Sequence, residues 1–247
     1  MNENINNLFN FYREAGACPS VSLIEEVHFC AVSGLNNSWP QMVFGLELSP
    51  NPATDIGQIL TKTVSENLPG FAVCNADFFN MQSLEILREK DIYPVKIWTL
   101  MNARSFASKP HGQQKNVEIR KLQTTTELHD FMDLINAEFL QSAKMNPVLA
   151  EEMNDKDAFS FYGLFAAGEL VSGLLAFSDL NTTGLYFIAT KRAFRGKGLA
   201  AGLIRHVTSL CRQETNKVVL QATQKAVPLY TRLGFSVCGK MVIFWKR

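Results

Sequence analysis

The sequence lacks the ligand spacings of common metal and redox sites. Its 247 residues include only four histidines, which stand singly. Five cysteines are present, and no two of them stand at C-x-x-C spacing. Zinc sites and redox pairs need ligands at short, regular intervals. We therefore expect no metal, and we expect free thiols in a reducing compartment at Cys18, Cys30, Cys74, Cys211 and Cys238.

Long apolar runs are also missing. The most apolar stretch, around Tyr162–Leu180, is interrupted by Glu169, so no uninterrupted apolar run reaches the roughly 18–20 residues that cross a bilayer. The N-terminus has no basic segment followed by an apolar one, which is the pattern of a secretory signal. These absences predict a cytoplasmic protein with no membrane partner.

Acidic residues are scarce at one end of the chain. The formal net charge is +1, which argues against a nucleic-acid partner. Residues 191–247 nevertheless contain twelve basic residues and one acid, Glu214, whereas residues 1–80 contain two basic and eight acidic residues. This gradient predicts that the last quarter of the chain faces an anion. A solvated basic surface is the alternative.

Apolar residues are abundant enough for more than one core. They make up 47% of the chain, against 19% charged residues, as in folded proteins. A polar segment with Pro110 and Gly112 divides the chain. We predict an N-terminal α/β domain at 1–105, a linker at 106–116 and a second domain at 117–247.

Helical and strand periodicities alternate in both halves. In the first half, helices are expected at Met1–Glu14, Ala53–Leu68 and Phe79–Lys90, between strands at Val27–Ser33, Gln41–Leu48, Phe71–Asn75 and Tyr93–Leu100. The second half is expected to form strands at Val117–Leu122, Phe159–Ala166, Leu170–Leu180, Gly184–Thr190, Val218–Thr223 and Ser236–Trp245, with helices at Glu127–Lys144, Gly198–Glu214 and Ala226–Leu233. A threonine run precedes the first of these helices and can cap it. The crossover helix before Val218–Thr223 implies that this strand and the one before it are parallel.

The strongest chemical signal is a glycine-rich loop at the start of a helix. Arg195-Gly196-Lys197-Gly198-Leu199-Ala200 follows a strand that ends at Thr190. Glycines let backbone N–H groups approach a ligand, and a helix N-terminus supplies unpaired donors with partial positive charge. The loop therefore predicts a site for a phosphate-type anion. It does not match the P-loop pattern. The next strand also lacks the acid that binds ribose in dinucleotide-binding folds, which disfavours a nucleotide-dependent oxidoreductase.

Three segments in this order resemble the GNAT superfamily of acyl-CoA-dependent N-acetyltransferases. They are the strand ending Phe187-Ile188-Ala189-Thr190, the loop Arg195–Ala200, which matches [QR]-x-x-G-x-[GA], and the segment Leu229–Phe235, which reads L-Y-x-x-x-G-F. The resemblance runs from Val117 to the end of the chain. It implies a GNAT fold of the α/β (α+β) class, with a mixed, mostly antiparallel sheet and helices on both faces. Residues 38–101 resemble, more distantly, the degenerate N-terminal half of two-domain members, which implies a smaller related domain that walls the acceptor pocket.

The resemblance also implies an activity. The chain would transfer an acetyl group from acetyl-CoA to a primary amine of a small molecule or protein, by direct attack in a ternary complex. Backbone groups of one strand would bind the pantetheine arm, and one N–H would polarise the acetyl carbonyl: Ile188, Ala189 and Thr190. Backbone N–H groups of the loop would hold the pyrophosphate: Arg195, Gly196, Lys197, Gly198, Leu199 and Ala200. Thr223 would take the place of an asparagine common in the family, and Tyr230 would protonate the leaving thiolate as a general acid.

Several points stay open at this stage. No glutamate stands in Gly184–Thr190, where many members keep a carboxylate base, and no base is assigned among Glu138, Glu151, Glu152 and His129. The acidic first 80 residues suggest a cationic acceptor, such as a polyamine, an amino sugar or a lysine side chain. The protein is expected to be a monomer or homodimer. The alternative function is a non-catalytic acyl-CoA-binding or protein-interaction module on the same fold, which Tyr230 disfavours.

Overall fold

The computed structural model describes residues 2–103, 117–139, 144–180, 182–211 and 217–247. The predicted linker at 106–116 lies outside these residues. In the part of the chain that is described, no helix is long and apolar enough to cross a membrane.

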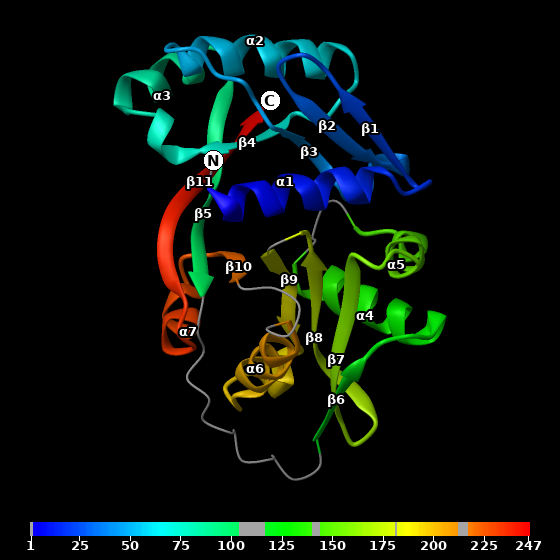
Figure 1. Cartoon of the computed structure of the whole chain (residues 1–247). Helices are drawn as coiled ribbons and strands as arrows, with labels where there is room; N and C mark the ends of the chain where they lie inside the picture. Colours follow the sequence, from blue (N-terminus) through cyan, green and yellow to red (C-terminus); the bar gives the residue numbers. More distant parts are fainter. Residues whose placement is uncertain (1, 104–116, 140–143, 181, 212–216) are drawn as a thin grey trace.

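An eleven-stranded sheet runs through the described residues, in the order β1-β2-β3-β4-β11-β5-β10-β9-β8-β7-β6 (Figure 1). The first half contributes β1 (Val21–Glu25), β2 (Cys30–Gly34), β3 (Gln41–Phe44), β4 (Phe71–Asn75) and β5 (Ile92–Ala103). The second half contributes β6 (Val117–Lys121), β7 (Phe159–Ala166), β8 (Glu169–Ser178), β9 (Thr182–Thr190), β10 (Lys217–Ala222) and β11 (Ser236–Lys246). Neighbouring strands are antiparallel except in the pairs β9–β10 and β3–β4. The predicted mixed, mostly antiparallel sheet is confirmed, and so is the parallel β9–β10 pair.

The two halves of the chain interleave in this sheet. β5, from the first half, lies between β10 and β11 of the second half. Met101 of β5 stands opposite Leu220 of β10, and both are buried. β11 in turn pairs with β4 as well as with β5. The last strand of the first half therefore completes the sheet of the second half, and the division into two domains stays a prediction.

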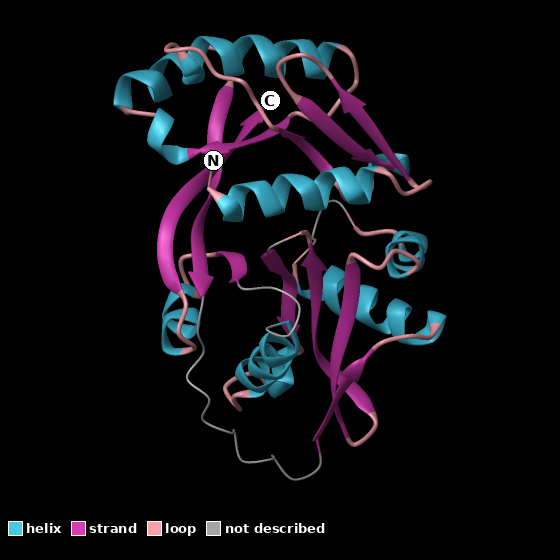
Figure 2. Cartoon of the chain, in the orientation of Figure 1, coloured by secondary structure: helices cyan, strands magenta, loops and turns pink. Residues whose placement is uncertain are grey.

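Helices cover both faces of the sheet, as Figure 2 shows. In the described residues they are α1 (Glu3–Gly16), α2 (Pro52–Ser65), α3 (Met81–Arg88), α4 (Thr125–Glu138), α5 (Pro147–Asn154), α6 (Leu199–Cys211) and α7 (Val227–Arg232). Side chains of α1, α4 and α5 form one buried cluster with β9 residues such as Tyr186, which we call the α1 core. Side chains of α6 and α7 form a second cluster with Leu185, which we call the α6 core. Since Leu185 and Tyr186 are adjacent in β9, the two cores lie on opposite faces of that strand.

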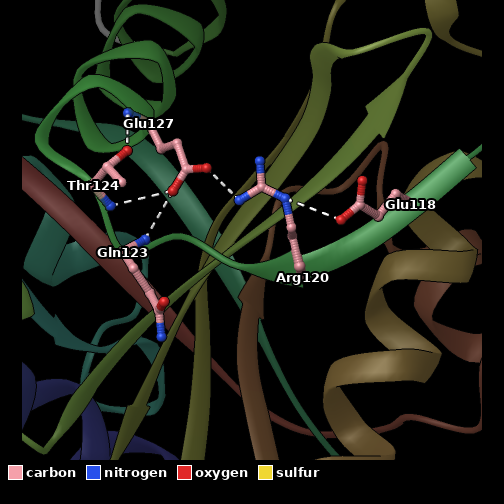
Figure 3. Close-up of polar contacts among 5 residues, drawn as sticks. All are labelled: Glu118, Arg120, Gln123, Thr124 and Glu127. Atoms are coloured by element: carbon pink, nitrogen blue, oxygen red, sulfur yellow. Dashed lines mark hydrogen bonds and ion pairs between the residues drawn. The ribbon is translucent and has the colours of Figure 1, made fainter.

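The start of α4 shows how local sequence sets an element boundary (Figure 3). The Thr124 hydroxyl accepts a hydrogen bond from the backbone N–H of Glu127 (3.3 Å). The Glu127 carboxylate accepts the N–H groups of Gln123 (3.0 Å) and Thr124 (3.2 Å) and pairs with Arg120, which also pairs with Glu118 (3.2 Å). These bonds, the one from Gln123 first, lower the pKa of Glu127 to about 2. The predicted threonine cap is confirmed, and it forms a reciprocal capping box.

Most predicted elements lie where the periodicity placed them, but two were missed. β1 was not predicted because it is a short strand of five residues with little alternation. α5 was not predicted either, although Asn146 and Pro147 are a start signal: the Asn146 side chain accepts the N–H of Val148 (3.1 Å). The helix expected to reach Lys144 ends at Glu138, so its predicted end was wrong.

Candidate active site

The parallel strands β9 and β10 separate after a short paired segment. Their register covers only Thr182–Gly184 of β9, opposite Lys217–Val219 of β10. On the other side of β9, the backbone N–H of Lys191 donates to the carbonyl of Val171 in β8 (2.9 Å). Because backbone groups alternate in direction along a strand, those of Thr190 and Ile188 point away from β8, into the opening. The second half of β9 therefore has backbone hydrogen-bonding groups that do not pair with β10.

A bulge in β9 lies beside this opening. Tyr186 pairs with Leu175 of β8 and Ala189 pairs with Gly173, so Phe187 and Ile188 stand opposite a single residue. Phe187 has φ +50°, a backbone conformation that residues with a Cβ rarely adopt. As a result Tyr186 and Phe187, although adjacent, both pack on the α1 core, whereas Ile188 packs on the α6 core.

The loop before α6 depends on its glycines for conformation. Gly196 and Gly198 both have φ +77°. A Cβ added at Gly196 would meet nothing within 4 Å, so the requirement there is the left-handed backbone and not space. The N–H of Gly202 donates to the carbonyl of Gly198 (3.0 Å) at the beginning of the helix. The N–H groups that precede it in the first turn have no partner within the helix, which suits an anion.

The strand opening, the loop and α7 enclose one cavity of about 760 Å³. Nine of the ten predicted binding residues line it: Ile188, Ala189, Thr190, Arg195, Gly196, Gly198, Leu199, Ala200 and Thr223. Lys197 does not line it, and its Nζ lies 5.0 Å from the centre of the Phe194 ring. The structure thus brings together residues that are about 35 positions apart in sequence.

Comparison with known proteins agrees with this geometry. Residues 114–244, more than half of the chain, match the sequence model of the acetyltransferase (GNAT) domain. The chain belongs to the GNAT family. The predicted GNAT fold and the predicted acetyltransferase class are therefore confirmed. A search among curated proteins found no match.

Solved structures resemble this GNAT protein over nearly its whole length. A GCN5-related N-acetyltransferase from Kribbella flavida has a TM-score of 0.69 at 13% identity, covering 97% of this chain and 95% of its own. A functionally unknown conserved protein from Staphylococcus epidermidis has a TM-score of 0.65 at 15% identity, covering 91% and 93%. A GCN5-related N-acetyltransferase from Sphaerobacter thermophilus has a TM-score of 0.62 at 14% identity, covering 91% and 82%. At these identities the likeness shows the fold, and it includes the N-terminal half.

Three basic residues that the sequence reasoning missed also line the GNAT cavity. They are Arg205 of α6, Lys225 before α7 and Arg232 at the end of α7. Among the described residues, the side chains of Lys225 and Arg232 make no hydrogen bond or ion pair. By contrast Lys191, beside the loop, already pairs with Glu169 (2.7 Å). The signal for them was the basic last quarter of the sequence, but the strand–helix periodicity did not show which of its cations face the cavity.

Tyr230 of this GNAT domain lies just behind the cavity wall. Its ring is buried in the α6 core, 5.9 Å from the ring of Phe235. Its neighbour Leu229 lines the cavity, whereas Tyr230 does not. Burial raises the pKa of Tyr230 to about 12, because the buried site disfavours the charged tyrosinate. Its role as a general acid stays a prediction.

Of the four residues left open as bases, one reaches the cavity. His129 pairs with Glu151 (Nε2–Oε1 2.7 Å), and neither lines the cavity. Glu152 of α5 accepts hydrogen bonds from the backbone N–H (3.0 Å) and the hydroxyl (2.5 Å) of Ser20, and it does not line the cavity. Glu138 lines the cavity.

Proposed function

We propose that this chain transfers an acetyl group from acetyl-CoA to a primary amine of a small molecule or protein by direct attack in a ternary complex. One observation carries the proposal: unpaired strand backbone, a glycine-rich helix start and Thr223 line the same cavity. Family membership supports the use of acetyl-CoA. It does not by itself assign residues, so the roles below belong to the proposal.

The cavity suits a long, flexible, anionic co-substrate. Its volume is about 760 Å³, and the small side chains of Ala200 and Ala201 leave room beside the first turn of α6. The positive φ of Gly196 and Gly198 turns the loop so that backbone N–H groups can face a pyrophosphate. The backbone of Ile188 and the N–H of Thr190 would bind the pantetheine amides as an added strand would.

When bound, acetyl-CoA supplies a thioester whose carbonyl a neutral amine can attack. Backbone at the β9 bulge would donate to the carbonyl oxygen as negative charge develops there. Tyr230, a neutral phenol just behind the cavity wall, would give its proton to the departing sulfur and regain one from solvent. No base is assigned, since β9 contains no carboxylate, and the amine would lose its proton to solvent.

We infer that the first half of the chain walls the acceptor side of the bulge. The Trp39 ring meets the Phe187 ring edge-on, 5.0 Å between centres, and the backbone N–H of Trp39 donates to the carbonyl of Lys144 (3.1 Å). Trp39 therefore links the first half to the α1-core side of β9. Ile188 lines the cavity on the other face, so an amine would reach the thioester from the Phe187 side.

Three acids of the first half are engaged elsewhere and give no support to a cationic acceptor. Glu25, Glu26 and Glu47 lie on the outer surface, where each pairs with a basic or imidazole side chain. The groups near Phe187 are aromatic instead, and they include Phe11, 6.4 Å from it. An apolar wall destabilises an ammonium ion, which favours the neutral form of the amine that attacks.

The proposal is tested by incubating the protein with acetyl-CoA and a panel of amines while free thiol is measured. We expect thiol release with at least one amine, and we expect Tyr230→Phe to lower kcat about 100-fold, the low end for general acid catalysis, with unchanged CoA binding. Tight CoA binding without turnover on any amine would favour the non-catalytic module. Absence of CoA binding would exclude both acyl-CoA functions.

A further inference from the structure

Glu138 connects α4 to the anion-binding loop. It is the last residue of α4, its side chain is only 17% exposed, and it lines the cavity. One carboxylate oxygen, Oε1, accepts the backbone N–H of Arg192 (3.2 Å), where the loop begins. The other, Oε2, pairs with Nη2 of Arg195. A single carboxylate thus contacts the loop at two points, three residues apart.

Arg195 is oriented by these contacts and by the strand. Its Nε donates to the carbonyl of Thr190 (3.1 Å), and its Nη2 meets Glu138. A guanidinium has five N–H donors in a rigid plane, so two anchored edges fix the orientation of the whole group. The guanidinium stays 55% exposed and lines the cavity, and its other donors make no bond to another described residue. Those donors are available to an anion.

The position of Glu138 on its helix is unfavourable by itself. The C-terminal end of a helix has partial negative charge, which repels a carboxylate. The bonds to Arg192 and Arg195 offset this repulsion, since both are donors and one is a cation. The groups that stabilise the Glu138 carboxylate at this position therefore come from the loop and not from α4.

We propose that Glu138 is a positioning residue for co-substrate binding: it holds the loop at Arg192 and aims the guanidinium of Arg195 at the phosphates. This inference rests on the proposed function, because the phosphates are those of CoA. The roles of two predicted residues, Arg195 and Thr190, follow from these contacts. Arg195 acts through an orientation set by Glu138, and the carbonyl of Thr190 is engaged by Arg195, which leaves the N–H of Thr190 for the pantetheine arm.

Two other roles for Glu138 predict different behaviour. A general base would act on the amine, so its loss would lower kcat and move the pH–rate profile. A carboxylate that mainly repelled the phosphates would have the opposite effect on binding, and its removal would tighten CoA.

The test compares Glu138→Ala and Glu138→Gln with the wild type by calorimetric titration with CoA and by steady-state kinetics. We expect Glu138→Ala to raise the Kd for CoA and the KM for acetyl-CoA about 10-fold, as for loss of one charge-assisted contact, with kcat within about twofold. Glu138→Gln keeps an oxygen that can accept the Arg192 N–H, so we expect it to recover part of the affinity. Glu169→Gln removes the neighbouring ion pair to Lys191 from outside the cavity and is the matched control.

A double variant shows whether Glu138 acts through Arg195. We expect the loss of CoA affinity in Glu138→Ala combined with Arg195→Ala to be smaller than the sum of the two single losses, because both single variants remove the same ion pair and only the Arg192 contact is lost in addition. A fall in kcat at constant KM, tighter CoA binding, additive losses in the double variant, or affinity equal to wild type would each overturn the inference. In all of these cases the wild type still binds CoA. If the wild type itself does not bind CoA, the proposed function fails together with this inference, so the two failures are distinguishable.

Discussion

At the scale of single residues, the cavity wall divides into positions that present backbone and positions that present charge. Gly196 and Gly198 matter through φ angles that other residues adopt at a cost. Lys225 and Arg232 matter through side chains that have no partner among the described residues. Tyr230 belongs to neither group, because its ring is in the core and only its neighbour lines the cavity. Loss of charge and loss of backbone geometry should therefore be separable by experiment.

Because the side chains of Lys225 and Arg232 at the cavity are unpaired among the described residues, we expect them to recognise the phosphates of the co-substrate. We expect Lys225→Ala and Arg232→Ala each to raise the KM for acetyl-CoA about two- to fivefold, the range for exposed ion pairs, with kcat unchanged. The KM for S-acetyl-pantetheine, which lacks the pyrophosphate and nucleotide, should not change. Moderate salt should reproduce the effect in the wild type by screening. The kinetics of both thioesters would be measured side by side.

A control separates local charge from net charge in this comparison. Lys240→Ala removes one positive charge from β11, outside the cavity wall. If it raised the KM for acetyl-CoA as much as Lys225→Ala does, the assignment of charge recognition to the cavity would be wrong.

At the scale of elements, α4 begins at a cap formed by neighbouring residues, and its last residue makes long-range contacts. The capping box of Thr124 and Glu127 marks the start of α4, and it is visible in sequence. The end of α4 at Glu138 has no comparable signal in the sequence, and the contact of Glu138 with the loop after β9 is not visible there either. The periodicity of the segment extends past that point, which is why the predicted helix was too long.

The cap of α4 predicts a stability that depends on pH. The pKa of Glu127 is about 2 in the folded chain and near 4.5 in the unfolded chain. A lowered pKa means that its contribution is complete above the unfolded value and is lost as pH falls toward 2. We expect Glu127→Gln to lower the free energy of unfolding by about 1–2 kcal/mol at pH 7. Denaturant melts at pH 7 and pH 3 measure it.

The same denaturant melts can also contradict this prediction about Glu127. The difference between Glu127→Gln and the wild type should shrink at pH 3, where the unfolded carboxylate is already protonated. A difference that stayed constant with pH would mean that the ionised carboxylate contributes nothing beyond an acceptor. Glu118→Gln, which removes the more exposed partner of Arg120, should have an effect of at most about 1 kcal/mol at either pH.

At the scale of the whole molecule, the interleaved sheet makes the two halves depend on each other. β5 separates β10 from β11, so removal of the first half leaves both strands without their shared neighbour. The α1 core also loses a helix, since Leu8, Phe11 and Tyr12 of α1 are buried in it. The charge gradient along the sequence is also a gradient in space. Basic residues of the last quarter line the cavity, whereas Glu25, Glu26 and Glu47 form ion pairs on the outer surface.

This interleaving predicts that the GNAT half does not fold alone. We expect the fragment 117–247 to show no cooperative thermal transition and no CoA binding, because β10 and β11 would expose apolar faces and unpaired edges. The measurements are circular dichroism against temperature and a CoA titration. Co-expression of 1–105 with 117–247 should restore both. A folded, CoA-binding fragment would show that the predicted domain boundary is also a folding boundary.

The sequence by itself determined the features that depend on neighbouring residues. The strands Phe71–Asn75 and Phe159–Ala166, the cap of α4 and the loop at 195–200 could all be predicted, because periodicity, capping and the left-handed glycine backbone are local. Only the tertiary structure decided that β5 completes the sheet of the other half, that Glu138 holds Arg195, and that Lys225 and Arg232 face the cavity. Glu138 and Arg195 are 57 positions apart, and paired residues of β5 and β10 are more than 100 positions apart. These contacts are set by the packing of whole elements, which a pattern read over a few turns does not contain.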